Sequence, residues 1–303
     1  MPPSSSPEQT EPEQITLSSG TVAELIEKEG TWALRINGAR QSHIGPPGQD
    51  PDLTAVRWML FALGGQLPQS VAHLGGGLLT LPRVIADRRP ASRQIVVELE
   101  PALVDLARTR FGLPEGLSLH QGDARAWLEE NPGQDLDAVV LDVFAGDRIP
   151  PAFTSLECFT AARAAMADDG RLVINSVAGP DLLFTRRELA TMRSVFEHVA
   201  MIVQGSALGG ARFGNAALIG SPAPLDIEAI RSSLAGDSSK GALVTDIDPI
   251  IDGAQPVTDA EELWSPEPIM PMVESAKRMV EQFKKMEQQV RAIQPDKTPE
   301  TER

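Results

Sequence analysis

Hydrophobic and polar residues follow different periods in successive parts of the chain. Over residues 15–50, apolar side chains recur at every second position, as at Leu34 and Ile36, which is the period of a half-buried strand. The pair Asn37-Gly38 follows one such run, and Asn-Gly favours a tight two-residue hairpin turn. The pattern therefore predicts a small N-terminal β-hairpin module over residues 15–50.

From residue 51 to residue 222, short apolar runs alternate with stretches of helical period. The expected strands are 70–75, 94–100, 117–120, 136–143, 171–177, 198–204 and 214–221. The expected helices are 52–63, 80–88, 101–111, 123–130, 153–167 and 182–196. This alternation predicts an α/β domain with a mostly parallel, seven-stranded sheet that helices cover on both faces. Because only a short link joins the last two strands, they are expected to form an antiparallel edge.

The remaining segments differ in composition from this domain. Residues 1–14 and 296–303 are polar and are expected to be disordered tails. Residues 223–268 carry ten acidic and two basic side chains, counted over 222–268, and are expected to be irregular apart from a possible helix over residues 226–236. This segment is either a solvated acidic loop or a lid that faces a cationic substrate. Over 269–295 apolar residues alternate spacings of four and three, which predicts an amphipathic helix. That helix either docks on its own domain or pairs with another chain, so a homo-oligomer is expected.

Charge and cysteine content narrow the possible functions. The formal net charge of −15 argues against a nucleic-acid partner, because such proteins normally present a basic face. A single cysteine, Cys158, excludes a disulfide framework and a cysteine-rich metal site, and no metal is expected. The polar start of the chain is no signal peptide, and no apolar run is long enough to span a membrane. We therefore expect a cytoplasmic protein without a membrane partner.

Chemistry-bearing residues gather where the expected parallel strands end. Gly75, Gly76 and Gly77 separate a strand from a helix, and glycines let a backbone approach a ligand closely. Glu98 ends the second strand, where a carboxylate is able to accept hydrogen bonds from both ribose hydroxyls. Asp123 follows the third strand and Asp142 the fourth; Asp123 is suited to accept from an adenine amino group, or caps the next helix. Together these strand ends predict a nucleoside pocket. A P-loop is excluded, because no Gly-Lys-Ser/Thr follows the glycines.

Four stretches carry a resemblance to a known family. The runs "HLGGGLLTLPRVIA", "IVVELEPALVDLAR", "GDARAWL" and "VVLDVFAGDRIPPAFTSLECF" resemble the spermidine synthase (polyamine aminopropyltransferase) family, in its bacterial spermidine synthase-like branch. The run "LRINGARQSHI" is similar to the N-terminal hairpin of that family. The resemblance covers about residues 30–222. It implies a Rossmann-like, class I methyltransferase fold over residues 51–222.

The resemblance also implies a ligand and a reaction. The ligand would be decarboxylated S-adenosylmethionine or S-adenosylmethionine, as the co-substrate of a transferase in polyamine biosynthesis that acts on a small amine. Asp142 matches the catalytic aspartate of the family, which would accept a proton from the attacking amine. The binding residues that the resemblance implies are Gln41 and Gly75, Gly76 and Gly77 for the sulfonium side, Glu98 for the ribose, and Asp123 with Ala124 for the adenine.

The chain departs from the family at several positions. Leu78 stands where the family has an aspartate that holds the amino group of the ligand, and Leu79 replaces the next glycine. Ala145 replaces a second pocket acid, while Asp147 lies two residues further on, and the chain has no tyrosine to surround a polyamine. Three functions therefore stay open: an aminopropyltransferase, an S-adenosylmethionine-dependent methyltransferase, and an inactive oligomeric scaffold.

Two further residues have a functional and a structural interpretation. His43 follows Gln41 by two positions and is either a base over the pocket or a structural histidine. Asp259 either returns to the site from the acidic segment or caps a turn.

Overall fold

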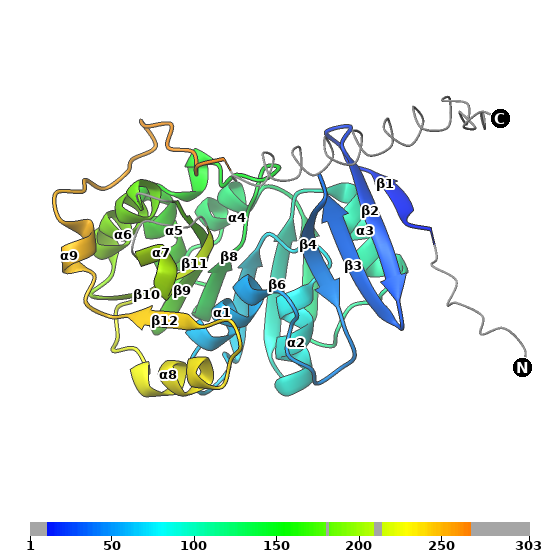
Figure 1. Cartoon of the computed structure of the whole chain (residues 1–303), viewed down its shortest axis with the longest axis horizontal. Helices are drawn as coiled ribbons and strands as arrows, with labels where there is room; N and C mark the ends of the chain where they lie inside the picture. Colours follow the sequence, from blue (N-terminus) through cyan, green and yellow to red (C-terminus); the bar gives the residue numbers. More distant parts are fainter. Residues whose placement is uncertain (1–10, 180–181, 209–213, 268–303) are drawn as a thin grey trace, which may run out of the picture. The chain divides into compact units, whose positions relative to one another are not determined.

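The computed structural model describes residues 11–179, 182–208 and 214–267. Two sheets form the framework (Figure 1). The larger sheet has eight strands in the order β12-β10-β11-β9-β8-β5-β6-β7. Its strands are β5 (Ser70–Leu74), β6 (Arg93–Glu98), β7 (Leu117–Gln121), β8 (Leu136–Leu141), β9 (Met166–Ala178), β10 (His198–Gln204), β11 (Gly214–Ser221) and β12 (Gly241–Val244).

The middle of this sheet is parallel and one side is antiparallel. Strands β7, β6, β5, β8 and β9 pair in parallel, whereas β11, β10 and β12 add to β9 by antiparallel pairing. The carboxyl ends of β5, β6, β7 and β8 therefore meet at one edge, where doubly wound folds bind ligands.

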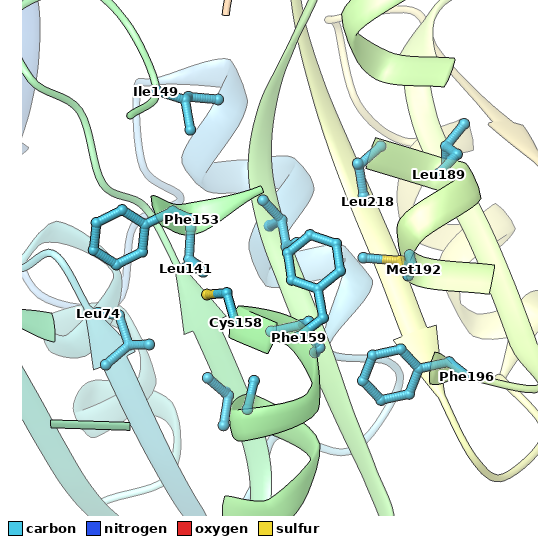
Figure 2. Packing of buried hydrophobic residues seen from close by; sticks show 14 of the residues in the cluster. Leu74, Leu141, Ile149, Phe153, Cys158, Phe159, Leu189, Met192, Phe196 and Leu218 are labelled. Carbon is cyan, nitrogen blue, oxygen red and sulfur yellow. The ribbon is translucent and has the colours of Figure 1, made fainter. Parts of the chain in front are cut away.

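Alternate residues of each strand send side chains to opposite faces, and each face is buried by its own helices. One face packs against α1 (Thr54–Ala62), α2 (Thr80–Arg88) and α8 (Ile227–Ala235). The other packs against α4 (Ala124–Glu130), α5 (Leu156–Ala165) and α6 (Leu183–Val195). Figure 2 shows this second layer, where Phe159 of α5 and Met192 of α6 belong to one cluster with the strand residues Leu141 and Leu218. Helix α3 (Pro101–Thr109) packs against β6 and β7 at the parallel edge.

The smaller sheet consists of four antiparallel strands, β1 (Glu13–Thr16), β2 (Val22–Lys28), β3 (Thr31–Ile36) and β4 (Ala39–Ile44). Its turns fall at Glu29-Gly30 and Asn37-Gly38, where all four residues have positive φ, as a type I′ turn requires. Ala23, Leu25 and Leu34 form a buried cluster with Leu78 and Leu103 of the larger domain. This cluster fixes the small sheet against the loop after β5.

The described segments correct four parts of the sequence analysis. The larger sheet has eight strands instead of seven, and the N-terminal module is a four-stranded sheet instead of a hairpin. Strand β1 begins at Glu13, inside the expected tail 1–14. In the segment 223–268, α8 confirms the possible helix over 226–236, whereas β12 and α9 (Asp248–Ile251) stand where irregular structure was expected. The helix expected over 269–295, the oligomer it would mediate and the tail 296–303 lie outside the described residues.

The acidic segment 223–268 is ordered by contacts with helix α1. These contacts join residues far apart in the sequence, so local sequence pattern does not predict them. Trp58 Nε1 donates to Ser239 Oγ at 2.8 Å, and Arg57 pairs with Asp237 at 2.7 Å. Both contacts hold the stretch before β12 against α1, so that the short strand can pair with β10. Within the described ranges, no helix is long and apolar enough to cross a membrane.

Candidate functional site

A cavity of about 520 Å³ opens at the carboxyl ends of β5, β6 and β8, next to the N-terminal sheet. It receives side chains or backbone from both sheets. All eight residues predicted from the sequence line it: Gln41, Gly75, Gly76, Gly77, Glu98, Asp123, Ala124 and Asp142. The structure thus brings the predicted set together in one place.

The three glycines are required by neighbouring protein atoms. A Cβ on Gly75 would lie 2.2 Å from the carbonyl oxygen of Asp142, and one on Gly76 would lie 2.7 Å from Val96 Cγ1. Gly77 has φ 49°, and its Cβ would lie 2.4 Å from Ser42 Oγ. Any side chain at these positions would displace the loop, so the triple glycine sets the loop's position between β8, β6 and the N-terminal sheet.

The Glu98 carboxylate organises this loop. Its Oε2 accepts hydrogen bonds from the backbone N–H groups of Gly76 at 2.8 Å and Gly77 at 2.7 Å, and its Oε1 accepts from the N–H of Glu100 at 2.8 Å. Charge-assisted bonds of this kind are stronger than neutral ones. An ionised carboxylate has about four acceptor positions, and three are in use here, so about one remains for a ligand hydroxyl. In this structure, Glu98 therefore fixes the position of the glycine loop through hydrogen bonds.

Asp123 is the N-cap of α4. Its Oδ1 accepts from the backbone N–H groups of Arg125 at 2.7 Å and Ala126 at 2.9 Å. The helix-cap interpretation is therefore correct, and it is compatible with a ligand contact because both capping bonds use the same oxygen. Ala124, the first residue of α4, is buried beside it.

Asp142 continues the pleat of β8, since its N–H donates to the Leu74 carbonyl at 2.8 Å. Its Oδ1 accepts from Asn175 Nδ2 of β9 at 2.8 Å. Burial raises the pKa of Asp142, the Asn175 hydrogen bond opposes this, and the negative charge of Glu98 adds to the rise. A carboxyl group with a raised pKa is a better proton acceptor than an ordinary surface aspartate.

The described wall of the cavity is acidic and carries no fixed positive charge. Its described lining includes the carboxylates of Glu98, Glu100, Asp123 and Asp142, and no lysine or arginine. His73 also lines it, but burial lowers the pKa of His73 to about 4 despite its bond to Gln94, so the ring is neutral at pH 7. The cavity therefore favours cationic ligands.

Comparisons with known proteins agree with this geometry. A probable spermidine synthase from Corynebacterium glutamicum has 30% sequence identity and a TM-score of 0.76, over 84% of this chain and 99% of that protein. This chain belongs to the spermidine synthase family. No family model matches it.

Two matches among curated proteins are shorter. The polyamine aminopropyltransferase of Vibrio vulnificus is 32% identical over 130 residues, which is 42% of each chain. The eEF1A lysine and N-terminal methyltransferase of Danio rerio is 29% identical over 143 residues, 44% of this chain and 20% of that protein. The match to the aminopropyltransferase spans less than half its length.

The positions 78 and 79, at which this chain departs from the family pattern, have a structural explanation. The Leu78 side chain is fully buried in the cluster that docks the N-terminal sheet, and it does not line the cavity. Leu79 has φ 63° and ψ 37°, the left-handed conformation for which glycine is suited. It is also fully buried, against Val96, Val104 and Leu119. Both leucines therefore stabilise the loop by hydrophobic packing, and neither side chain lines the cavity.

Sequence reasoning missed several residues of the site. Ser42 Oγ accepts from the N–H of Leu78 at 3.1 Å, and Asn175 contacts Asp142. Asn175 is a polar residue within the apolar run "RLVINSV", which was the available signal. By contrast, His43 and Asp259 do not line the cavity. Asp259 forms a bidentate pair with Arg125, at 2.8 and 3.1 Å. Among the described residues, none from the acidic segment lines the cavity, so the lid interpretation lacks support.

Proposed function

We propose that this protein transfers an aminopropyl group from decarboxylated S-adenosylmethionine to an amine. The observation that carries the proposal is the charge of the cavity wall: four carboxylates and, among its described residues, no lysine, arginine or protonated histidine. Decarboxylated S-adenosylmethionine bears a sulfonium and an ammonium and matches such a wall. S-adenosylmethionine bears an additional carboxylate, which would lie there without a cationic partner.

The donor would lie across the strand ends. Glu98 would accept from a ribose hydroxyl, Asp123 with Ala124 would meet the adenine, and Gln41 would lie near the sulfonium side together with the glycine loop. Asp142 would then face the amine. As the amine attacks the carbon next to the sulfonium, it loses a proton, and a carboxylate at that point would accept the proton and stabilise the developing ammonium.

Binding and turnover together test this proposal. Isothermal calorimetry with decarboxylated S-adenosylmethionine, S-adenosylmethionine and methylthioadenosine should give at least tenfold tighter binding of the decarboxylated donor than of S-adenosylmethionine. Incubation of that donor with a panel of amines should release methylthioadenosine. Tighter binding of S-adenosylmethionine, or no methylthioadenosine from any amine, would overturn the proposal.

Methyl transfer is the second candidate, and Leu78 is the observation that favours it. With a leucine packed beneath the N-terminal sheet at this position, the chain lacks the acid by which the family grips the ammonium of the aminopropyl donor. The sequence match to a methyltransferase of Danio rerio is consistent with this candidate. Formation of S-adenosylhomocysteine from S-adenosylmethionine would support it.

A further inference from the structure

Part of the cavity is lined by residues of the large sheet and of helices α1 and α2, and we call this part the recess. Six residues that line the cavity form the recess: Val56 and Met59 of α1, Leu81 and Pro82 of α2, His73 of β5 and Val140 of β8. All six are buried. Five of them supply hydrocarbon surface, and the recess is therefore an apolar extension of an otherwise acidic site.

Strand register places Asp142 at the entrance of this recess. His73 pairs with Val140 in the parallel ladder between β5 and β8, so their side chains are neighbours on one face of the sheet. Val140 packs in the same cluster as Val56, Met59 and Leu81. Asp142 follows two residues after Val140 along a continuous pleat, so its side chain projects from the same face.

Polar groups around the recess provide no second anion. His73 Nε2 is 2.9 Å from Gln94 Oε1, and Gln94 Nε2 donates to the Pro82 carbonyl at 3.0 Å. Thr80 Oγ1 accepts from the His43 N–H at 3.0 Å. The six residues that form the recess include no carboxylate, and Asp142 is the carboxylate that strand register places next to them. One ammonium would be neutralised at the entrance, and a second, further in, would not.

We infer that the recess takes the hydrocarbon chain of the acceptor and that the acceptor is a primary monoamine with an aliphatic chain. This inference rests on the proposed aminopropyl transfer and specifies its substrate class. A diamine of the same length would place its distal ammonium among Val56, Met59 and Leu81, where an unpaired charge is strongly disfavoured. A methyl group at that position instead gains by burial, at about 0.8 kcal/mol for each CH₂ removed from water.

The reaction balances with this acceptor. The lone pair of the neutral amine forms a nitrogen–carbon bond to the aminopropyl carbon next to the sulfonium. The carbon–sulfur bond breaks, and its electron pair stays on sulfur, giving methylthioadenosine. The new secondary ammonium loses one proton to the Asp142 carboxylate, which returns it to solvent. The neutral amine is the form that attacks, so an amine that arrives as an ammonium first loses its proton to solvent.

Acceptors matched in length test the inference. With decarboxylated S-adenosylmethionine as donor, kcat/KM for methylthioadenosine release should be at least tenfold higher with n-butylamine than with 1,4-diaminobutane, and should rise further with n-hexylamine. A second readout is independent of turnover: calorimetric titration of the same amines into protein saturated with methylthioadenosine. An equal or higher value for the diamine in either readout would overturn the inference.

A variant that fills the recess provides the structural control. Val56→Phe should lower kcat/KM and affinity for n-hexylamine at least tenfold while leaving ethylamine within twofold, and Val56→Ile should have a smaller effect in the same direction. If both variants leave the preference for n-hexylamine over ethylamine unchanged, the hydrocarbon chain of the acceptor does not occupy the recess. Binding of hexylamine without any binding of the decarboxylated donor would overturn the proposed function and leave the recess assignment standing.

Discussion

Nδ2 of Asn175 donates a hydrogen bond of 2.8 Å to Oδ1 of Asp142 and so links two adjacent parallel strands at the site. Asn175 is buried, and its Oδ1 has no hydrogen-bond partner among the described residues. The asparagine holds the carboxylate on the α1 face and opposes the rise in its pKa that burial causes. We assign Asn175 as a positioning residue for Asp142.

Removal of that hydrogen bond should shift the pH dependence of turnover. In the proposed mechanism the ionised form of Asp142 is the proton acceptor, so activity should fall as pH decreases through the pKa of Asp142. In Asn175→Ala the pKa of Asp142 should rise, and the acid limb of kcat/KM should move to higher pH by about one to two pH units, since a bond to a charged group is worth about 1.5–3 kcal/mol. Asp142→Asn should lose at least a hundredfold in kcat with donor affinity within threefold. An unshifted acid limb in Asn175→Ala would contradict the positioning role.

Glu98→Gln should weaken donor binding by at least tenfold and also destabilise the fold, by about 1–3 kcal/mol. The amide group can no longer accept from Gly76, Gly77 and Glu100 together, because one of its two polar atoms is a donor. Calorimetry and urea denaturation measure the two effects. Asp137→Asn is the matched control, because its carboxylate also accepts from two backbone N–H groups, those of Gln69 and Ser70, but does not line the cavity; donor affinity should stay within twofold. If Glu98→Gln changes donor affinity without changing the free energy of unfolding, the hydrogen bonds from Glu98 to the loop do not explain the loss of donor affinity.

Leu78→Asp should destabilise the protein by about 3 kcal/mol or more without improving donor binding. The new carboxylate would lie unpaired among Leu25, Leu34 and Leu103. Leu78→Met, which conserves volume, should cost less than about 1.5 kcal/mol. Urea denaturation measures both. Tighter binding of the decarboxylated donor to Leu78→Asp, at unchanged stability, would show that the side chain reaches the cavity.

Leu79→Gly should be more stable than Leu79→Ala by about 1 kcal/mol, although glycine is ordinarily the less favourable residue. Both variants remove the same buried contacts with Val96 and Val104. Only glycine relieves the left-handed backbone at φ 63°, which costs an L-residue roughly 1–2 kcal/mol. Thermal or urea denaturation of the pair isolates backbone strain from packing. An equal or lower stability of the glycine variant would contradict this explanation.

A pH-dependent contribution to stability is expected from Glu188. This carboxyl group of α6 is fully buried, accepts from Ser176 Oγ, and its other oxygen has no partner among the described residues. Burial raises the pKa of Glu188 to about 8, against the opposing effect of the Ser176 bond. Because the pKa is raised in the folded protein, protonated Glu188 contributes to the free energy of unfolding. This contribution is fully present below about pH 4.5 and is lost as pH rises toward 8.

Glu188→Gln removes this titration and keeps the shape of the side chain. Between about pH 5 and pH 8, the wild-type protein should lose stability relative to the variant by up to about 1.4 kcal/mol per pH unit. Urea denaturation at several pH values measures the difference, in which the other titrating groups cancel. Parallel stability curves would show that Glu188 does not titrate in this range.

The regular part of the fold followed from the sequence because it depends on local pattern. Seven of the eight strands of the large sheet overlap the predicted apolar runs, although β9 begins at Met166, inside the predicted helix 153–167. The strand ends brought Glu98, Asp123 and Asp142 to one cavity. Strand β12 did not follow, since four residues carry little signal and the contacts of Arg57 and Trp58 with Asp237 and Ser239 span 180 residues or more.

The roles of the site residues were harder to predict than their location. The three glycines suggested close approach to a ligand, but their neighbours in the structure are Asp142, Val96 and Ser42. Glu98 suggested a ribose acceptor, yet its carboxylate already binds three backbone N–H groups. Such roles depend on atoms from other strands, and neither hydrophobic period nor motif spacing contains that information.

The burial of Leu78 couples ligand binding in the cavity to the stability of the N-terminal sheet. The same five-residue loop supplies Gly75, Gly76 and Gly77 to the cavity and Leu78 to the cluster beneath the N-terminal sheet. A ligand that restrains the glycines thereby restrains the leucine, and through it Leu25 and Leu34. By thermodynamic linkage, ligand binding should then slow amide hydrogen exchange in β2 and β3. Conversely, a mutation that loosens the small sheet should weaken ligand affinity without touching a ligand-contacting residue.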